Sequence, residues 1–196
     1  MKKLLPFIFL ALLLNSCCKD HSDVIPGQNF IPEDILEEIE NNGQVIYSGF
    51  NPPALKGRYR LSPTILVSSN FADIYSPGQE FKSQILEFSD FRRSDLTLEV
   101  LIKDEDGVNE TKGRGGFIAG EGNDFTIYIR EDTKNTTTGH VHLTTTVLSG
   151  TLDANGIINL QLSRFMIDDN GDPDGNLFEN GNGRLFKDGD GYSEKF

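Results

Sequence analysis

The chain has 196 residues, of which 37% are hydrophobic and 24% are charged, so it can form a sizeable core. It carries 18 Lys and Arg against 30 Asp and Glu, a net charge of −12, and such a surface repels nucleic acid. Its two cysteines are adjacent, Cys17 and Cys18, so we expect one domain without an internal disulfide.

The N-terminus has the pattern of a secretory signal. Lys2 and Lys3 precede an apolar run over residues 4–14, which is shorter than the roughly 17–25 residues of a membrane-spanning helix. The run leads into Leu-Asn-Ser-Cys at residues 14–17, which resembles the lipobox of bacterial lipoproteins, although that family prefers Ala, Ser, Thr or Val where Asn15 stands. The resemblance implies that residues 1–16 are a signal peptide and that Cys17 is acylated.

The segment after Cys17 is predicted to be a lipid-anchored linker over residues 17–30. Its start, residues 18–23, looks like the segment that follows the lipid cysteine in surface-exported lipoproteins of the Bacteroidota. We therefore expect a lipid-anchored protein of the outer membrane, and a single folded domain over residues 31–196. Within this domain a helix is predicted over residues 32–41, because Ile35, Leu36 and Ile39 form one apolar face and Gly43 can end the helix.

From Gly57 onward apolar residues recur with a period of two, which is typical of β-strands. The regular segments are 96–103, 125–130, 141–147 and 158–163, and the less regular ones are 58–69, 80–88, 116–119 and 184–187. Turn signals such as Asp106-Gly107 and Asn155-Gly156 lie between them. About eight consecutive antiparallel strands predict an all-β fold, an up-and-down barrel with the helix packed against one end; a β-sandwich is the alternative.

A family resemblance supports the barrel. Gly57-Arg58-Tyr59 resembles the Gly-x-Trp that opens the first strand of lipocalins and other calycins, and Arg184 lies on the last predicted strand, where those families pack an Arg across the aromatic ring. Together with residues 51–53, 120–125 and 184–191, these residues look like a group of lipocalin-like lipoproteins of the Bacteroidota. The resemblance implies a fold and a location, but no chemistry.

An acidic loop over residues 168–179 has the spacing of an EF-hand calcium loop. The predicted calcium ligands are Asp168, Asn170, Asp172, Asp174 and Glu179. A cation would cancel the repulsion among these carboxylates, but Pro173 stands at the position where an EF-hand has Gly. A solvated acidic turn is the alternative, and no other cofactor is expected.

His140 and His142 share one face of a predicted strand, as a zinc site would require, with Glu131 and Asp132 as the nearest acids in sequence. The alternative is a polar strand face, which continues through Thr144 and Thr146.

No catalytic signature is visible: the chain has no Gly-x-Ser-x-Gly, no candidate catalytic Cys and no Trp. We therefore predict a protein that is not an enzyme, a lipid-anchored barrel that binds a small apolar or sugar-like ligand. The alternative is an accessory envelope protein that binds another protein through the barrel rim. Apolar side chains that fill the lumen would favour the accessory protein, and small or polar residues inside would favour a ligand.

Overall fold

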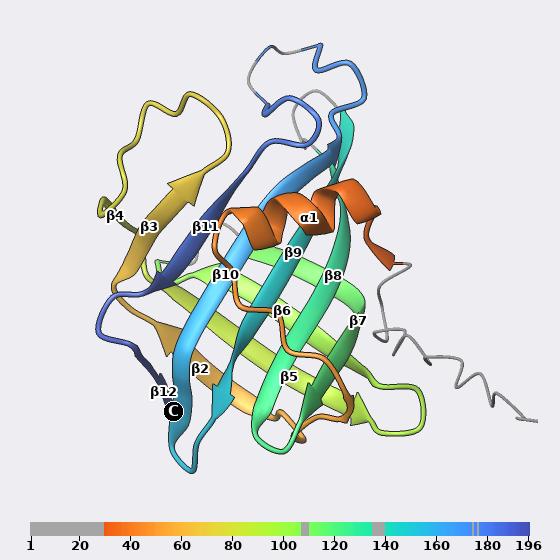
Figure 1. Ribbon diagram of the computed structural model, residues 1–196, viewed down its shortest axis with the longest axis vertical. Helices are drawn as coiled ribbons and strands as arrows, with labels where there is room; N and C mark the ends of the chain where they lie inside the picture. Colours follow the sequence, from red (N-terminus) through yellow and green to blue (C-terminus); the bar gives the residue numbers. More distant parts are fainter. Residues whose placement is uncertain (1–29, 107–109, 135–139, 174, 176) are drawn as a thin grey trace, which may run out of the picture.

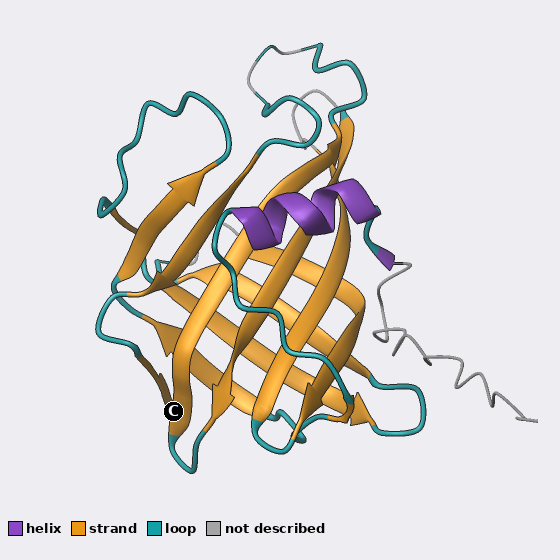
Figure 2. Ribbon diagram, viewed as in Figure 1, coloured by secondary structure: helices purple, strands orange, loops and turns teal. Residues whose placement is uncertain are grey.

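The computed structural model describes residues 30–106, 110–134, 140–173, 175 and 177–196. In this part of the chain one α-helix, α1 (Glu33–Asn41), precedes twelve β-strands, which dominate the fold (Figure 2). The strands are β1 (Phe50–Asn51), β2 (Gly57–Leu61), β3 (Thr64–Ser69), β4 (Glu80–Phe81), β5 (Gln84–Arg92), β6 (Thr97–Asp104), β7 (Glu110–Glu121), β8 (Asp124–Lys134), β9 (Val141–Leu152), β10 (Gly156–Asp168), β11 (Gly183–Asp188) and β12 (Tyr192–Lys195).

Eight of these strands close into an antiparallel barrel (Figure 1). β2 pairs with β5, and β5 to β10 then follow one another as neighbours in chain order. β12 pairs with both β10 and β2, through Ile157↔Ser193 and Arg60↔Glu194, and so closes the ring. The predicted all-β barrel is confirmed, and closure excludes the β-sandwich. Outside the ring, β1 pairs in parallel with β7.

Two strands of the barrel continue beyond the ring as bent strands. β3 follows β2 after Ser62 and Pro63, while β11 precedes β12 across the turn 189–191. β3 pairs with β11 and with β4, so this side of the wall extends past the closed ring. It ends at the loops 70–79 and 169–182, at the top of Figure 1. We call this end of the barrel the mouth.

Side chains fill the barrel below the mouth. Large apolar residues from every strand of the ring except β12 point inward and are almost fully buried, because alternate positions of each strand face the axis. This core comprises Leu55, Tyr59, Leu61, Leu86, Phe88, Leu96, Leu98, Val100, Ile102, Ile118, Phe125, Ile127, Ile129, Leu148, Ile157, Leu160 and Leu162. The lower lumen is therefore packed like a protein interior.

Helix α1 forms where the sequence predicts it, but it covers the side wall of the barrel rather than its end (Figure 1). Its buried face, Ile35, Leu36 and Ile39, packs on the outer surface of the sheet. The residues that face outward under the helix are apolar, among them Tyr128 and Val147. Because they lie outside the barrel, only a further element such as α1 can shield them from water. The predicted end-on position of the helix is wrong for this reason.

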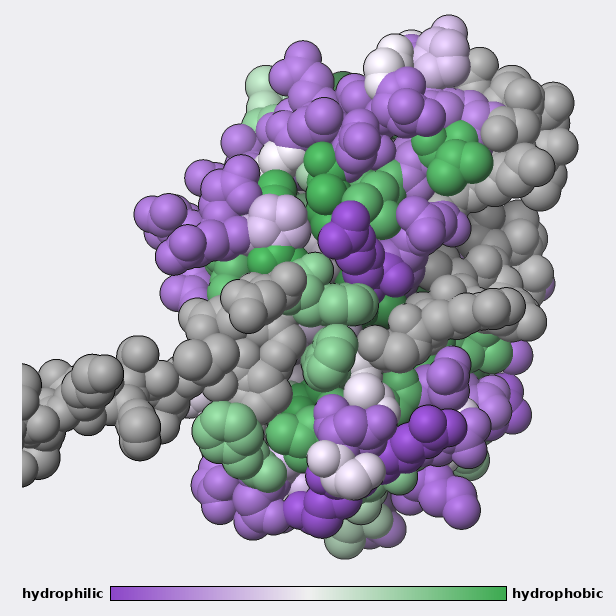
Figure 3. All heavy atoms as spheres, turned by 90° about the vertical axis from the view of Figure 1, so that its right-hand side faces the viewer, coloured by the Kyte–Doolittle hydropathy of each residue, from purple (hydrophilic) through white to green (hydrophobic). Residues whose placement is uncertain are grey.

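Elsewhere the surface is largely hydrophilic, and on the face drawn in Figure 3 hydrophobic residues form small patches among polar ones. In the described chain, the large hydrophobic residues that are most exposed are Val45, Phe50, Ile74, Val141, Ile158 and Phe196. They come from separate elements, and scattered exposure of this kind is normal for a soluble surface.

Candidate functional site

The inward positions of the barrel change from apolar to polar toward the mouth. On β8 the buried series Phe125, Ile127 and Ile129 is followed by Glu131, which is also buried. Because alternate residues of a strand share one face, Glu131 points into the barrel as Ile129 does. The β8–β9 register places Thr144 opposite Glu131, at the same height in the lumen.

Two further residues complete a group that we call the polar belt, Glu131, Thr144, Thr146 and Arg164. The β9–β10 register pairs Thr146 with Arg164, and Arg164 Nε donates a hydrogen bond to Thr146 Oγ1 at 3.4 Å. Both threonines are buried. The polar belt therefore presents one carboxyl, one guanidinium and two hydroxyl groups to the inside of the barrel.

The carboxyl group of Glu131 is the least satisfied member of the polar belt. Its side chain is only 4% exposed, and Oε1 has no hydrogen-bond donor among the described residues. Burial raises the pKa of Glu131, while the positive charge of Arg164 and the hydroxyls of Thr146 and Thr144 act against this rise. A buried acceptor without a donor is costly, so this oxygen favours a ligand that brings a hydroxyl or N–H group.

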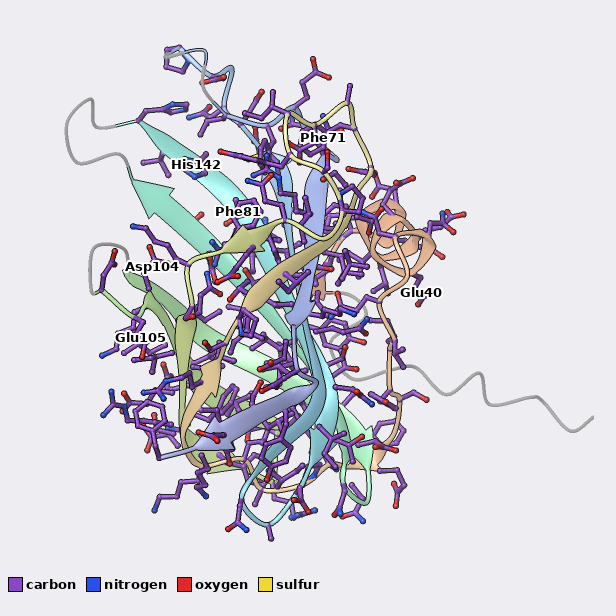
Figure 4. The ribbon with its side chains drawn as sticks, turned by 90° about the vertical axis from the view of Figure 1, so that its left-hand side faces the viewer. Glu40, Phe71, Phe81, Asp104, Glu105 and His142 are labelled. Carbon is purple, nitrogen blue, oxygen red and sulfur yellow. The ribbon has the colours of Figure 1, made fainter. Side chains whose placement is uncertain are left out.

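A cavity of about 180 Å³ lies beside the polar belt. Its lining is His142, Thr144, Arg164, Phe165, Met166, Leu177 and Phe178. Leu177 and Phe178 belong to the loop 169–182, which therefore forms the upper wall of the cavity. In Figure 4, His142 and Phe81 lie on one side of the upper strands, and helix α1 with Glu40 lies on the other.

A second cluster holds the two mouth loops together. Arg184 on β11 forms a bidentate ion pair with Asp73, with Nε–Oδ2 at 2.6 Å and Nη2–Oδ1 at 2.7 Å. Its guanidinium group also lies over the rings of Phe178, Tyr75 and Phe71, at 4.6, 4.9 and 5.6 Å from their centroids. The hydrogen bonds from Arg184 hold the pKa of Asp73 well below its usual range. The loop 70–79 is thus bound to the loop 169–182 beside the cavity.

The predicted histidine pair also reaches the mouth. The rings of His140 and His142 lie 6.3 Å apart, and His142 lines the cavity. Burial, with the charge of His140, lowers the pKa of His142, whereas Asp172 of the acidic loop acts to raise it. Asp132, one of the two expected acids, is exposed. Across the described ranges, no group of three His, Cys, Asp or Glu side chains is arranged to hold a metal.

The acidic loop uses its oxygens to bind its own backbone. Asp168 Oδ1 accepts from the N–H of Asn170 at 2.8 Å, and Asp172 Oδ2 accepts from the N–H of Leu177 at 3.0 Å. Glu179 is exposed, and Asp174 lies outside the described residues. Calcium binding at this loop stays a prediction.

The arginine expected across Tyr59 lies elsewhere. Arg184 belongs to β11 in the upper wall, and it contacts the aromatic rings of the mouth instead. The last strand of the chain, β12, pairs with β2 and places Lys195 opposite Tyr59, with Nζ 5.6 Å from the ring centroid. The sequence showed Arg184 on the last predicted strand because the short β12 after the turn 189–191 was not predicted.

The polar belt was only partly visible in the sequence. The alternation of His142, Thr144 and Thr146 with apolar residues predicts a polar strand face, but not the direction in which that face points. Glu131 was singled out only as a neighbour of the histidines, and Arg164 carried no signal. Sequence distance explains this, since Arg164 meets Thr146 through strand pairing and not through a local motif.

The predicted signal peptide, the acylated Cys17 and the start of the linker lie outside the described residues. Where the structure is described, no helix has the length and apolar character needed to cross a membrane. Comparison of the chain with protein-family models, with curated proteins and with solved structures finds no match.

Proposed function

We propose that the protein is a lipid-anchored binding protein of the cell envelope, which holds a small sugar-like ligand in the mouth of its barrel without catalysing a reaction. The observation that carries this proposal is the buried carboxyl group of Glu131, which has one oxygen without a donor in the described chain and lies opposite Thr144, a residue that lines the cavity. A carboxyl oxygen that lacks a donor is complementary to the hydroxyl groups of a sugar.

The lining residues of the cavity support the same ligand class. Arg164 offers further donors, Thr144 offers a hydroxyl that can donate or accept, and Phe178 offers an aromatic ring for the apolar face of a sugar ring. The cavity of about 180 Å³ is smaller than the 300–1,000 Å³ of typical drug-sized sites. We therefore expect a ligand the size of about one sugar ring.

The filled lower lumen limits where a ligand binds. Because large side chains occupy the barrel below the polar belt, the ligand binds at the mouth and not at the depth of the barrel. The packed lower lumen favours the accessory protein, whereas the polar residues buried near the mouth favour a ligand. Between the two ligand classes, this arrangement supports a sugar-like ligand over an apolar one, since the apolar part of the lumen is already packed.

Titration of the mature protein with a panel of neutral monosaccharides, followed by backbone amide NMR, tests this proposal. A binding sugar is expected to shift the amides of residues 142–146 and 164–166 and to be recovered unchanged. Glu131→Gln is expected to weaken binding at least tenfold, while Glu99→Gln, at an exposed position of β6, is expected to leave it unchanged. No shift near the polar belt with any sugar of the panel would overturn the proposal.

The anchor is tested separately. In the native host, labelled fatty acid is expected to attach to the wild-type chain, and Cys17→Ala is expected to remove both the label and the partition into membranes. A wild-type chain that never carries the label, or a Cys17→Ala variant that keeps it, would show that Cys17 is not the anchor.

A further inference from the structure

A second recess, separate from the mouth, lies on the outer wall of the barrel beside the segment that follows helix α1. This segment, residues 42–49, crosses β10, β9 and β8 on the outside of the sheet, and we call it the strap (Figure 1). The recess measures about 470 Å³, within the range of small-molecule sites. Val45 and Tyr47 of the strap form one side of it, and the turn 189–191 after β11 forms the other. We call this recess the wall groove.

A row of four polar side chains crosses the outer wall at the level of the strap. The strand registers pair Thr126 with Ser149, Ser149 with Gln161, and Gln161 with Lys187, so the row runs from β8 to β11. Each of the four has a chain neighbour that belongs to the barrel core or packs against it. Because successive side chains of a strand point to opposite faces, the row itself faces outward.

The strap provides hydrogen-bond donors for three members of this row. Thr126 accepts from the N–H of Tyr47 at 2.7 Å, Ser149 from Gln44 Nε2 at 3.1 Å, and Gln161 Oε1 from the N–H of Val45 at 2.8 Å. The fourth member, Lys187, has no such contact with the strap. It is exposed, it lines the wall groove, and it forms no ion pair with any residue of the described chain. The row therefore presents one unpaired cation to the groove.

The turn side of the wall groove carries hydrogen-bond acceptors. Asp190 is exposed there, and its Oδ1 accepts from the N–H of Tyr192 at 2.9 Å. Asn159 of β10 is also exposed and lies next to the turn, since its N–H donates to the carbonyl of Gly191 at 2.9 Å. Its side-chain amide offers both a donor and an acceptor. Asp188 takes no part, because its buried side chain is turned to the lumen.

The chemistry of the wall groove limits the class of its ligand. Lys187 and Asp190 both line the groove but form no ion pair in the described chain, so a simple anion or cation would meet a like charge. An apolar ligand would remove water from both charged groups and give them no partner. Sugar hydroxyl groups avoid both costs, because each can accept from an ammonium group or donate to a carboxylate. The ring of Tyr47 adds a surface for the apolar face of a sugar ring.

From this geometry we infer that the wall groove is a second binding site, which holds a short neutral saccharide against Tyr47. Lys187 is the donor of this site, and Asp190 and Asn159 are its acceptors. At about 470 Å³ against about 180 Å³, the groove has room for about two sugar rings where the mouth has room for one. The backbone hydrogen bond from Tyr47 to the wall holds the strap in place before a ligand binds, which lowers the entropy cost of binding. The groove and the mouth cavity share no lining residue, so either can bind without the other.

Amide NMR titration of the mature protein with neutral disaccharides such as maltose and cellobiose tests this inference. Binding is expected to shift the amides of residues 45–47, 159–161 and 187–191. Tyr47→Ala is expected to weaken this binding about tenfold or more, because the ring surface is lost. Tyr47→Phe keeps the ring and the backbone hydrogen bond of the strap, so its affinity is expected to stay within about threefold of the wild type.

Matched variants separate the wall groove from the rest of the surface and from the mouth. Lys187→Met is expected to weaken disaccharide binding, whereas Lys56→Met, at another exposed lysine, is expected to leave it unchanged. Glu131→Gln, in the polar belt, is also expected to leave it unchanged, so failure of the mouth site would not imitate failure of the groove. Absence of groove shifts with every disaccharide, or shifts that persist at full affinity in Tyr47→Ala and Lys187→Met, would overturn the inference. Groove shifts with glycylglycine but with no saccharide would also overturn it, because the groove would then be a site for zwitterions.

Discussion

The packed state of the lower barrel leads to a quantitative prediction for Phe88→Ala. Phe88 is 1% exposed, and its ring centroid lies 5.6 Å from that of Tyr59 in the centre of the core. Truncation of a buried Phe costs about 3–5 kcal/mol, and about 0.5–1.5 kcal/mol of this belongs to the aromatic pair. We expect a loss in the upper part of this range, because hydrogen-bonded strands surround Phe88 and cannot move into the cavity that its removal leaves.

Thermal and urea denaturation measure this loss. For a domain of this size about 2–4 °C are lost per kcal/mol, so the melting temperature is expected to fall by about 6–20 °C. Phe50→Ala is the matched control, since Phe50 is 58% exposed and its removal is expected to change the free energy of unfolding by less than about 0.5 kcal/mol. Benzene is expected to raise the melting temperature of Phe88→Ala only, because an apolar cavity of this kind can bind it.

A loss below about 1.5 kcal/mol for Phe88→Ala would refute the reasoning. It would mean that the ring faces a space already filled by water or by a bound molecule, and that the lower barrel is a ligand chamber. The proposed position of the ligand at the mouth would then need to be revised.

Three further predictions concern the helix and the mouth. Ile39→Ala, on the buried face of helix α1, is expected to cost about 2–5 kcal/mol in urea denaturation, whereas Ile74→Ala, at an 88% exposed position, is expected to have almost no effect. Because the pKa of Glu131 is raised, its contribution to stability is present below the ordinary Glu pKa and is lost as pH rises through the raised value. Glu131→Gln is expected to flatten this part of the curve of melting temperature against pH. An unchanged slope would contradict the prediction. Because the pKa of Asp73 is lowered, its ion pair with Arg184 stabilises the mouth down to pH values below the ordinary Asp pKa. Asp73→Asn is expected to lower the free energy of unfolding by about 1.5–3 kcal/mol and to speed amide exchange in the loop 70–79. Unchanged exchange would show that the ion pair does not hold this loop.

The elements of this fold are local features, and the sequence predicts them well. The helix over residues 32–41 and strands such as 96–103 and 125–130 depend on the spacing of apolar side chains along a few turns or a few residues. Short connections between strands also predict the antiparallel order, because a hairpin leaves little choice of neighbour. The closed barrel followed from these two observations, and the structure confirms it.

Which face of each strand points inward is not a local feature. On β9, Val147 faces outward beneath helix α1, while Thr144 and Thr146 face the lumen near the mouth. The apolar face of a strand normally indicates the core side, but here the helix creates a second apolar layer outside the barrel. The bends that separate β2 from β3 and β11 from β12 likewise escaped prediction, because they depend on how the wall closes.

The sequence by itself therefore determined the type and order of most elements and the acidic net charge, and it predicts a signal peptide before Cys17, since each of these depends on composition or on residues close together in the chain. Only the tertiary structure decided that Thr144 lies opposite Glu131 and Thr146 opposite Arg164 near the mouth, and that Asp188 is buried with Ser193 and Ser62 as its hydrogen-bond donors. The strand registers and the closure of the ring through β12 set these contacts, and no local pattern encodes them.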